Sequence, residues 1–120
     1  MSMDSERKLS NIMIECDHVS KTFHAKDTET PVIKDLNITA RENEFLVLFG
    51  PGQCGKTTVL NVLSGLEPAS SGIVKVGGEI VTKPGPDRGF VYQTIALFPW
   101  YTVMKNVEYG PRVRGMSKKE

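Results

Sequence analysis

The nine residues from Gly50 to Thr58 read GPGQCGKTT and fit the pattern G-x-x-x-x-G-K-[ST]. Gly50, Gly52 and Gly55 lack a Cβ, so this stretch can take left-handed turns in which backbone N–H groups converge. Converging N–H groups at the start of a helix favour an anion. The stretch therefore predicts a P-loop, or Walker A motif, that grips the phosphates of a nucleoside triphosphate. A glycine-rich turn that only connects two elements is the alternative.

The predicted loop gives its side chains separate roles. Lys56 is expected to place a positive charge on the β and γ phosphates and to act in catalysis, and Thr57 to offer its hydroxyl to a bridging Mg²⁺. Cys54 has two interpretations: a thiol whose modification blocks phosphate binding, or a small neutral filler. The nucleotide-binding residues predicted by the motif are Gly50, Pro51, Gly52, Gln53, Cys54, Gly55, Lys56, Thr57 and Thr58.

The flanking segments have the order that a P-loop requires. Residues Phe45 to Phe49 form an unbroken apolar run, which predicts a strand buried on both faces, as in a parallel sheet. After the loop, apolar residues recur at helical spacing, at Val59, Leu60, Leu63 and Leu66. Strand, loop and helix together predict an α/β fold built around a P-loop NTPase core.

The composition limits the kinds of partner and the cell compartment that we expect for this chain. The 120 residues hold 15 Lys and Arg against 14 Asp and Glu, a formal charge of +1, which gives no reason to expect a nucleic-acid partner. The longest apolar run is far short of the ~20 residues of a membrane span, so we expect a cytoplasmic chain. Its cysteines, Cys16 and Cys54, match no zinc or redox spacing, which fits a reducing compartment.

Before the loop, the chain predicts a polar leader and two strands. Residues 1–11 are expected to be a disordered leader. Apolar and polar residues alternate in Ile12 to Phe23 and again in Leu36 to Ala40, which predicts two half-buried antiparallel strands around a loop from His24 to Thr30.

After the loop, the predicted elements are shorter. Alternation at Val74 and Val76, followed by two glycines and Glu79 to Val81, predicts a hairpin. Residues Gly89 to Gln93 predict another strand, and a short helix is expected to be opened by Thr102. Residues Ser117 to Glu120 have the spacing of a capping box, which predicts a further helix beginning there.

From about Ile12 onward, the chain resembles the amino-terminal half of an ATP-binding-cassette (ABC) ATPase, in the segments VSKTF, NEFLVLFGPGQCGKTTVLNVLSGLEPASSGIVKVGG, PGPDRGFVYQ and ALFPWYTVMKNV. The last two segments most resemble ATPase subunits of nitrate, sulfonate and taurine importers. The resemblance implies that residues 12–120 are the first part of a nucleotide-binding domain, with a P-loop NTPase core and an antiparallel β subdomain, incomplete in this chain. Asn43 stands where the family usually has glycine, and asparagine tolerates the same left-handed turn.

The resemblance also implies roles outside the loop. Phe23 matches the aromatic residue that stacks on adenine, and its alternative is an ordinary core residue at a strand end. Gln93 matches the Q-loop glutamine, a catalytic residue that reaches Mg²⁺ and the attacking water, and its alternative is a polar strand end. Trp100 resembles part of the surface that meets the transmembrane subunit, and its alternative is a packing anchor.

Four features that the family needs for hydrolysis do not occur in the 120 residues: an apolar strand ending in a Mg²⁺-binding Asp, the Glu that follows it, a switch histidine and an LSGGQ signature. We therefore expect this chain to bind ATP and Mg²⁺ but to hydrolyse ATP poorly, because general-base assistance alone contributes about 10²–10⁴ in rate. In the family, downstream sequence also supplies the neighbours of the strand at Phe45 to Phe49, so the chain is expected to be part of a longer ATPase.

The function implied by the resemblance is an energy-coupling ATPase subunit that drives uptake of a small anion. Its expected partners are a transmembrane permease, a second ATPase subunit and, indirectly, an extracytoplasmic solute-binding protein. That assembly would hold it at the inner face of the cell membrane. The alternatives are a non-hydrolysing nucleotide-binding or regulatory fragment, and a soluble ABC ATPase of DNA repair or translation.

Overall fold

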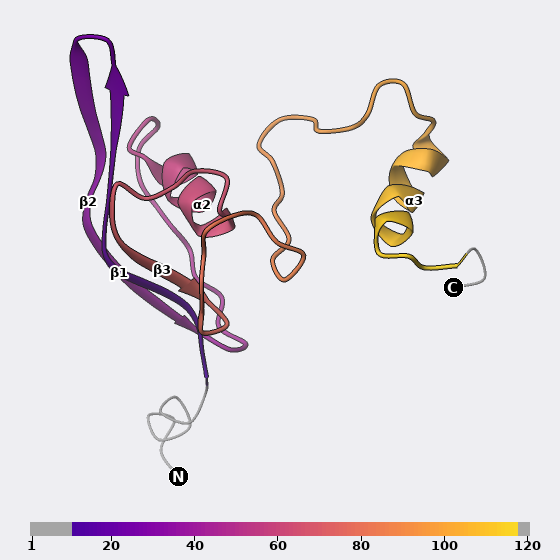
Figure 1. The fold of residues 1–120 in the computed structure, drawn as a ribbon, viewed down its shortest axis with the longest axis horizontal. Coiled ribbons are helices and arrows are strands. Elements are labelled where there is room, and N and C mark those ends of the chain that lie inside the picture. Colours follow the sequence, from indigo (N-terminus) through magenta and orange to yellow (C-terminus); the bar gives the residue numbers. More distant parts are fainter. Residues whose placement is uncertain (1–10, 118–120) are drawn as a thin grey trace. The chain divides into compact units, whose positions relative to one another are not determined.

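The computed structural model describes residues 11–117, which form two compact units (Figure 1). The first unit extends to Gly89 and the second begins at Phe90, and each is described by itself. The predicted leader at residues 1–11 lies outside the described residues except for its last one, and the predicted capping box lies outside them beyond Ser117.

The first unit is built on an antiparallel sheet of order β2-β1-β3-β4. Strands β1 (Ile12–Ala25) and β2 (Thr28–Arg41) pair along most of their length, with Cys16 opposite Ile38. The predicted pair of strands is therefore confirmed, but the loop expected at His24 to Thr30 is wrong. The strands continue through it to a two-residue turn, because the polar residues there pair across the hairpin.

The second hairpin is confirmed as predicted. Strand β3 (Ser71–Val76) pairs with the other edge of β1, and β4 (Glu79–Ile80) pairs with β3. The two glycines between them form the turn. β1 is thus hydrogen-bonded on both edges.

The core of the first unit lies where the sheet meets helix α2 (Lys56–Ser64), which Figure 1 shows beside the strands. The buried apolar residues come from three strands and the helix: Cys16 and Val19 from β1, Ile33 from β2, Val74 from β3 and Val62 from α2. Burial raises the pKa of the Cys16 thiol, which therefore stays protonated at neutral pH. Alternation in the strands thus predicted the buried face.

The apolar run Phe45 to Phe49 is a correction, because it forms no strand. Phe45 is 91% exposed and Phe49 is 99% exposed. A strand buried on both faces needs a neighbour on each edge and cover on each face, and no strand of the sheet in residues 11–117 pairs with this run. The left-handed turn expected before the run is present, since Asn43 has φ 60°.

The second unit holds helix α3 (Val103–Val113), which confirms the predicted helix. Thr102 caps it: its hydroxyl oxygen accepts a hydrogen bond from the Lys105 backbone N–H at 3.3 Å. The strand predicted at Gly89 to Gln93 is wrong, since these residues are irregular and pair with no strand of the described chain.

Lys21 is a charged residue on the buried face of β1. Its ammonium donates to the Pro68 carbonyl oxygen at 2.8 Å and pairs with Glu67 at 3.0 Å, just beyond the end of α2. The Lys21 side chain is 9% exposed and that of Glu67 is 37% exposed. This ion pair ties the centre of the sheet to the segment that follows the helix.

A bulge in β1 places His18 in a left-handed conformation, with φ 49°. The His18 backbone N–H donates to the Asn37 side-chain oxygen at 2.9 Å, and its ring Nδ1 lies 2.5 Å from the Asp35 carboxylate. Asp17 lies 3.8 Å from the other ring nitrogen. The hydrogen bond that His18 donates to Asp35, together with the charges of Asp35 and Asp17, raises the pKa of His18.

Replacing Lys21 with methionine should lower the free energy of unfolding by about 1–2 kcal/mol, because it leaves Pro68 and Glu67 without their donor. Urea denaturation followed by far-UV circular dichroism measures the change. The matched control is Lys75→Met, which removes a half-exposed pair with Glu15 and should cost no more than about 0.5 kcal/mol. Equal losses in the two variants would contradict a special role for Lys21.

Stability should fall as the pH rises through the raised pKa of His18. The contribution of the His18 pair is complete below the ordinary histidine pKa of about 6.5, and it disappears as the folded protein loses the His18 proton. Urea midpoints taken at intervals upward from that pH measure the effect. His18→Asn, which tolerates the same φ, should remove this part of the pH dependence; an unchanged profile would show that His18 does not cause it.

Candidate nucleotide site

The loop from Gly50 to Gly55 turns directly into α2, which begins at Lys56. Gly55 is the N-cap residue and has φ 100° and ψ 6°, a left-handed conformation that favours glycine. A Cβ on Gly55 would lie 3.0 Å from the Val32 Cγ1 of β2, and one on Gly50 would lie 2.8 Å from the Cys54 Sγ. The loop is therefore closed tightly enough that a side chain at either glycine would have to displace a neighbour.

The Lys56 ammonium lies within the loop. It donates to the carbonyl oxygens of Gly50 at 2.7 Å and Pro51 at 2.6 Å, and it lies 3.4 Å from the Cys54 Sγ. These contacts place a positive charge at the centre of the loop. Binding a phosphate would require Lys56 to exchange carbonyl acceptors for phosphate oxygens, which accept hydrogen bonds more strongly because they are charged.

The start of α2 adds a second positive feature to the loop. No acidic residue occurs in its first turn, so no carboxylate of the helix competes for the free N–H groups. Thr57 is exposed at this turn and Thr58 is half-buried. A loop of backbone N–H groups, one ammonium and an exposed hydroxyl is suited to a polyanion that carries a metal ion.

Phe23 and Gln93 are the predicted site residues outside the loop. Phe23 lies near the end of β1 with its side chain exposed, and the Lys21 ammonium lies 4.8 Å from the centre of its ring. Gln93 is exposed and irregular, and it belongs to the second unit, whereas the loop and Phe23 belong to the first. Within the first unit, the structure places Phe23 and the P-loop on the same sheet-and-helix body.

Sequence reasoning missed Lys21 as a residue close to the candidate site. A charged residue that shares a strand face with buried Val19 and aromatic Phe23 is the signal that could have identified it, because such a residue needs a partner when buried. Among residues 11–117, no cluster of three or more His, Cys, Asp or Glu side chains could hold a metal ion by itself.

Comparison with known proteins agrees with this geometry. The ABC transporter family matches residues 33–120. An uncharacterized ABC transporter ATP-binding protein of Methanocaldococcus jannaschii is 37% identical over 123 residues, covering all of this chain and 46% of that protein. The nitrate import ATP-binding protein of Synechocystis sp. is 38% identical over 107 residues, covering 89% of this chain and 40% of that protein. The taurine import ATP-binding protein of Escherichia coli O157:H7 is 37% identical over 106 residues, with coverage of 88% and 40%.

A solved structure shows the same fold. An ATP-binding cassette, determined as a dimer in a post-hydrolysis state with ADP and phosphate, matches with a TM-score of 0.78 and 27% identity, covering 89% of this chain and 51% of that one. The chain thus spans less than half the length of the curated relatives described above. Within residues 11–117, no helix is long and apolar enough to cross a membrane. The P-loop geometry, the family match over residues 33–120 and the shared fold together establish that this chain belongs to the ABC transporter family, as part of its ATP-binding cassette.

Proposed function

We propose that residues 12–120 are the ATP-binding part of the nucleotide-binding domain of an importer ATPase. The observation that carries the proposal is the closed loop with the Lys56 ammonium at its centre and the free N-terminus of α2 beside it. Importer function is supported by the relatives that are named for import of nitrate and taurine. The transported solute is then a small anion of the nitrate, sulfonate or taurine class.

The proposal gives each predicted site residue a defined role. The loop N–H groups and Lys56 hold the phosphates of ATP, and the Phe23 ring stacks on adenine. Thr57 and Gln93 would hold Mg²⁺ through oxygen atoms, and Gln93 would orient the attacking water. When bound, Mg²⁺ would supply positive charge that offsets the charge of the phosphates. Because the chain lacks a general base of the family's kind, binding and turnover are separate, and isolated chains bind ATP with little phosphate release.

The relatives that are named for import support an assembly with a membrane permease. A transmembrane permease and a second ATPase subunit are the direct partners, and an extracytoplasmic solute-binding protein acts through the permease. The subunit therefore lies at the cytoplasmic face of the membrane. The solved cassette that this chain resembles is itself dimeric, which supports the second ATPase subunit.

Replacing Lys56 with alanine should weaken ATP binding at least tenfold, because a hydrogen bond to a charged group contributes about 1.5–3 kcal/mol. Titration with a fluorescent ATP analogue and Mg²⁺ measures the affinity. The control is Lys34→Ala, which removes the same charge from an exposed position on β2 and should bind like the wild type. Equal affinities of Lys56→Ala and wild type would refute the proposed site.

The tight closure of the loop can be tested with two glycines. Gly55→Ala should lower the free energy of unfolding by about 1–2 kcal/mol, because alanine at φ 100° is strained and its Cβ meets Val32. Gly52→Ala should leave stability nearly unchanged, since nothing lies within 4 Å of a Cβ there. Thermal unfolding compares the two, and equal stabilities would contradict the loop geometry.

A further inference from the structure

The Lys21 side chain contacts both the ring of Phe23 and the segment that follows α2. Its ammonium lies over one face of the ring, 4.8 Å from the ring centre. The same ammonium donates to the Pro68 carbonyl oxygen at 2.8 Å and pairs with the Glu67 carboxylate at 3.0 Å. One buried cation thus joins an aromatic ring near the end of β1 to the chain just beyond the P-loop helix.

Hydrogen bonds on both sides of Lys21 hold that segment against β1. The Ser70 backbone N–H donates to the Ser20 carbonyl oxygen at 2.8 Å. The Thr22 backbone N–H donates to the Ser70 hydroxyl oxygen at 3.0 Å, and this hydroxyl donates to the Thr22 carbonyl oxygen at 3.3 Å. The carbonyl and the carboxylate that hold the Lys21 ammonium are therefore themselves fixed relative to the strand.

The Phe23 side chain is held much less firmly than Lys21. It lies outside the buried core and is 39% exposed, whereas the Lys21 side chain is 9% exposed. An aromatic side chain that the core does not enclose can exchange between rotamers unless a neighbour favours one of them. A cation attracts the electron-rich face of an aromatic ring, so the fixed ammonium favours the rotamer that the structure shows.

Folding stability alone does not explain a lysine at this position. Moving a cation from water to a buried site costs free energy, and apolar residues in place of a whole buried ion pair are often as stabilising. An apolar residue would also pack against Phe23, but it would not attract the face of the ring. The ring contact therefore gives the lysine a role that its ion pair does not require.

We propose that Lys21 is a positioning residue for nucleotide binding, which holds one face of the Phe23 ring so that the other face is ready to stack on adenine. This inference rests on the proposed function, in which Phe23 stacks on the base and the P-loop holds the phosphates. A ring that is ordered in advance loses less conformational entropy when the base binds. Since none of the Lys21 contacts described here involves the loop from Gly50 to Thr58, Lys21 adds affinity for the base and not for the phosphates.

The test compares two ligands by isothermal titration calorimetry of the whole 120-residue chain. One is ATP with Mg²⁺, and the other is inorganic tripolyphosphate with Mg²⁺, which has the phosphates without a base. Lys21→Met should weaken ATP binding about threefold to tenfold, the cost of ordering one side chain, and leave tripolyphosphate binding unchanged. The matched control is Lys75→Met, which removes a lysine of a half-exposed pair on β3 and should bind both ligands like the wild type. Far-UV circular dichroism checks that each variant is folded at the temperature of the titration.

A double-mutant cycle identifies the ring as the route of the effect. Phe23→Leu keeps an apolar side chain but removes the ring, so it should weaken binding of ATP and not of tripolyphosphate. In that background Lys21→Met should cause no further loss of ATP affinity, because the group that it positions is gone. Lys21→Gln keeps a hydrogen-bond donor and removes the charge, so it replaces Lys21→Met in the cycle if the methionine variant does not fold.

The outcomes separate the role of Lys21 from the proposed function. If Lys21→Met weakens both ligands equally, or neither, its role is overturned while the nucleotide site stands. A loss of ATP affinity that persists in full in Phe23→Leu overturns it as well, since the effect then does not pass through the ring. If Phe23→Leu binds ATP like the wild type, stacking on the base fails, and the role of Lys21 fails with it. A wild type that binds neither ligand refutes the nucleotide site itself.

Discussion

The first unit depends on β1 being hydrogen-bonded on both edges. β2 pairs with one edge and β3 with the other, so β1 has no free edge along the paired stretch. This central position lets one strand carry three kinds of residue: Val19 in the core, Lys21 in the ion pair beyond α2, and Phe23 at the exposed end. One strand therefore carries a core residue, the ion-pair partner of the segment after α2 and the candidate adenine-stacking ring.

The sequence predicted those features whose cause is local. Strand alternation located β1, β2 and the β3–β4 hairpin, and the threonine before the last helix located its N-terminus. The P-loop was predictable because glycine spacing and one lysine specify most of its chemistry within seven residues. Even the left-handed turn at Asn43 followed from the kind of residue that replaces glycine there.

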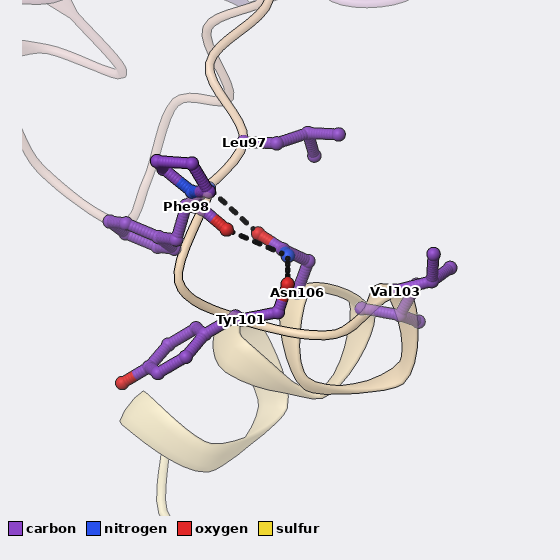
Figure 2. Close-up of a pocket in the computed structure, with 7 residues that line it drawn as sticks. Leu97, Phe98, Tyr101, Val103 and Asn106 are labelled. Atoms are coloured by element: carbon purple, nitrogen blue, oxygen red, sulfur yellow. Dashed lines mark hydrogen bonds between the residues drawn. The ribbon is translucent and has the colours of Figure 1, made fainter.

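Features that depend on distant partners were not predictable in the same way. The apolar run from Phe45 to Phe49 has the pattern of a buried strand, yet its phenylalanine side chains are exposed. An apolar pattern does not identify the neighbouring strands that would bury it. The hydrogen bonds of Asn106 likewise depend on a turn that brings four backbone groups to one amide (Figure 2). The structural role of Lys21 likewise depends on Glu67 and Pro68, which lie 46 and 47 positions further along the chain.

Local contacts and contacts between distant parts of the chain also distinguish nucleotide binding from hydrolysis. The contacts that shape the P-loop join Lys56 to residues two to six positions away, and Gly55 lies where a Cβ would meet Val32 of β2. Such a loop can form once β1, β2 and α2 are folded, because closing a short loop costs little conformational entropy. Orienting water and moving a proton, in contrast, require groups from separate parts of a cassette to meet at the γ-phosphate within hydrogen-bonding distance. Binding a nucleotide and hydrolysing it therefore make separate demands on a chain, and a measured nucleotide affinity does not by itself measure hydrolysis.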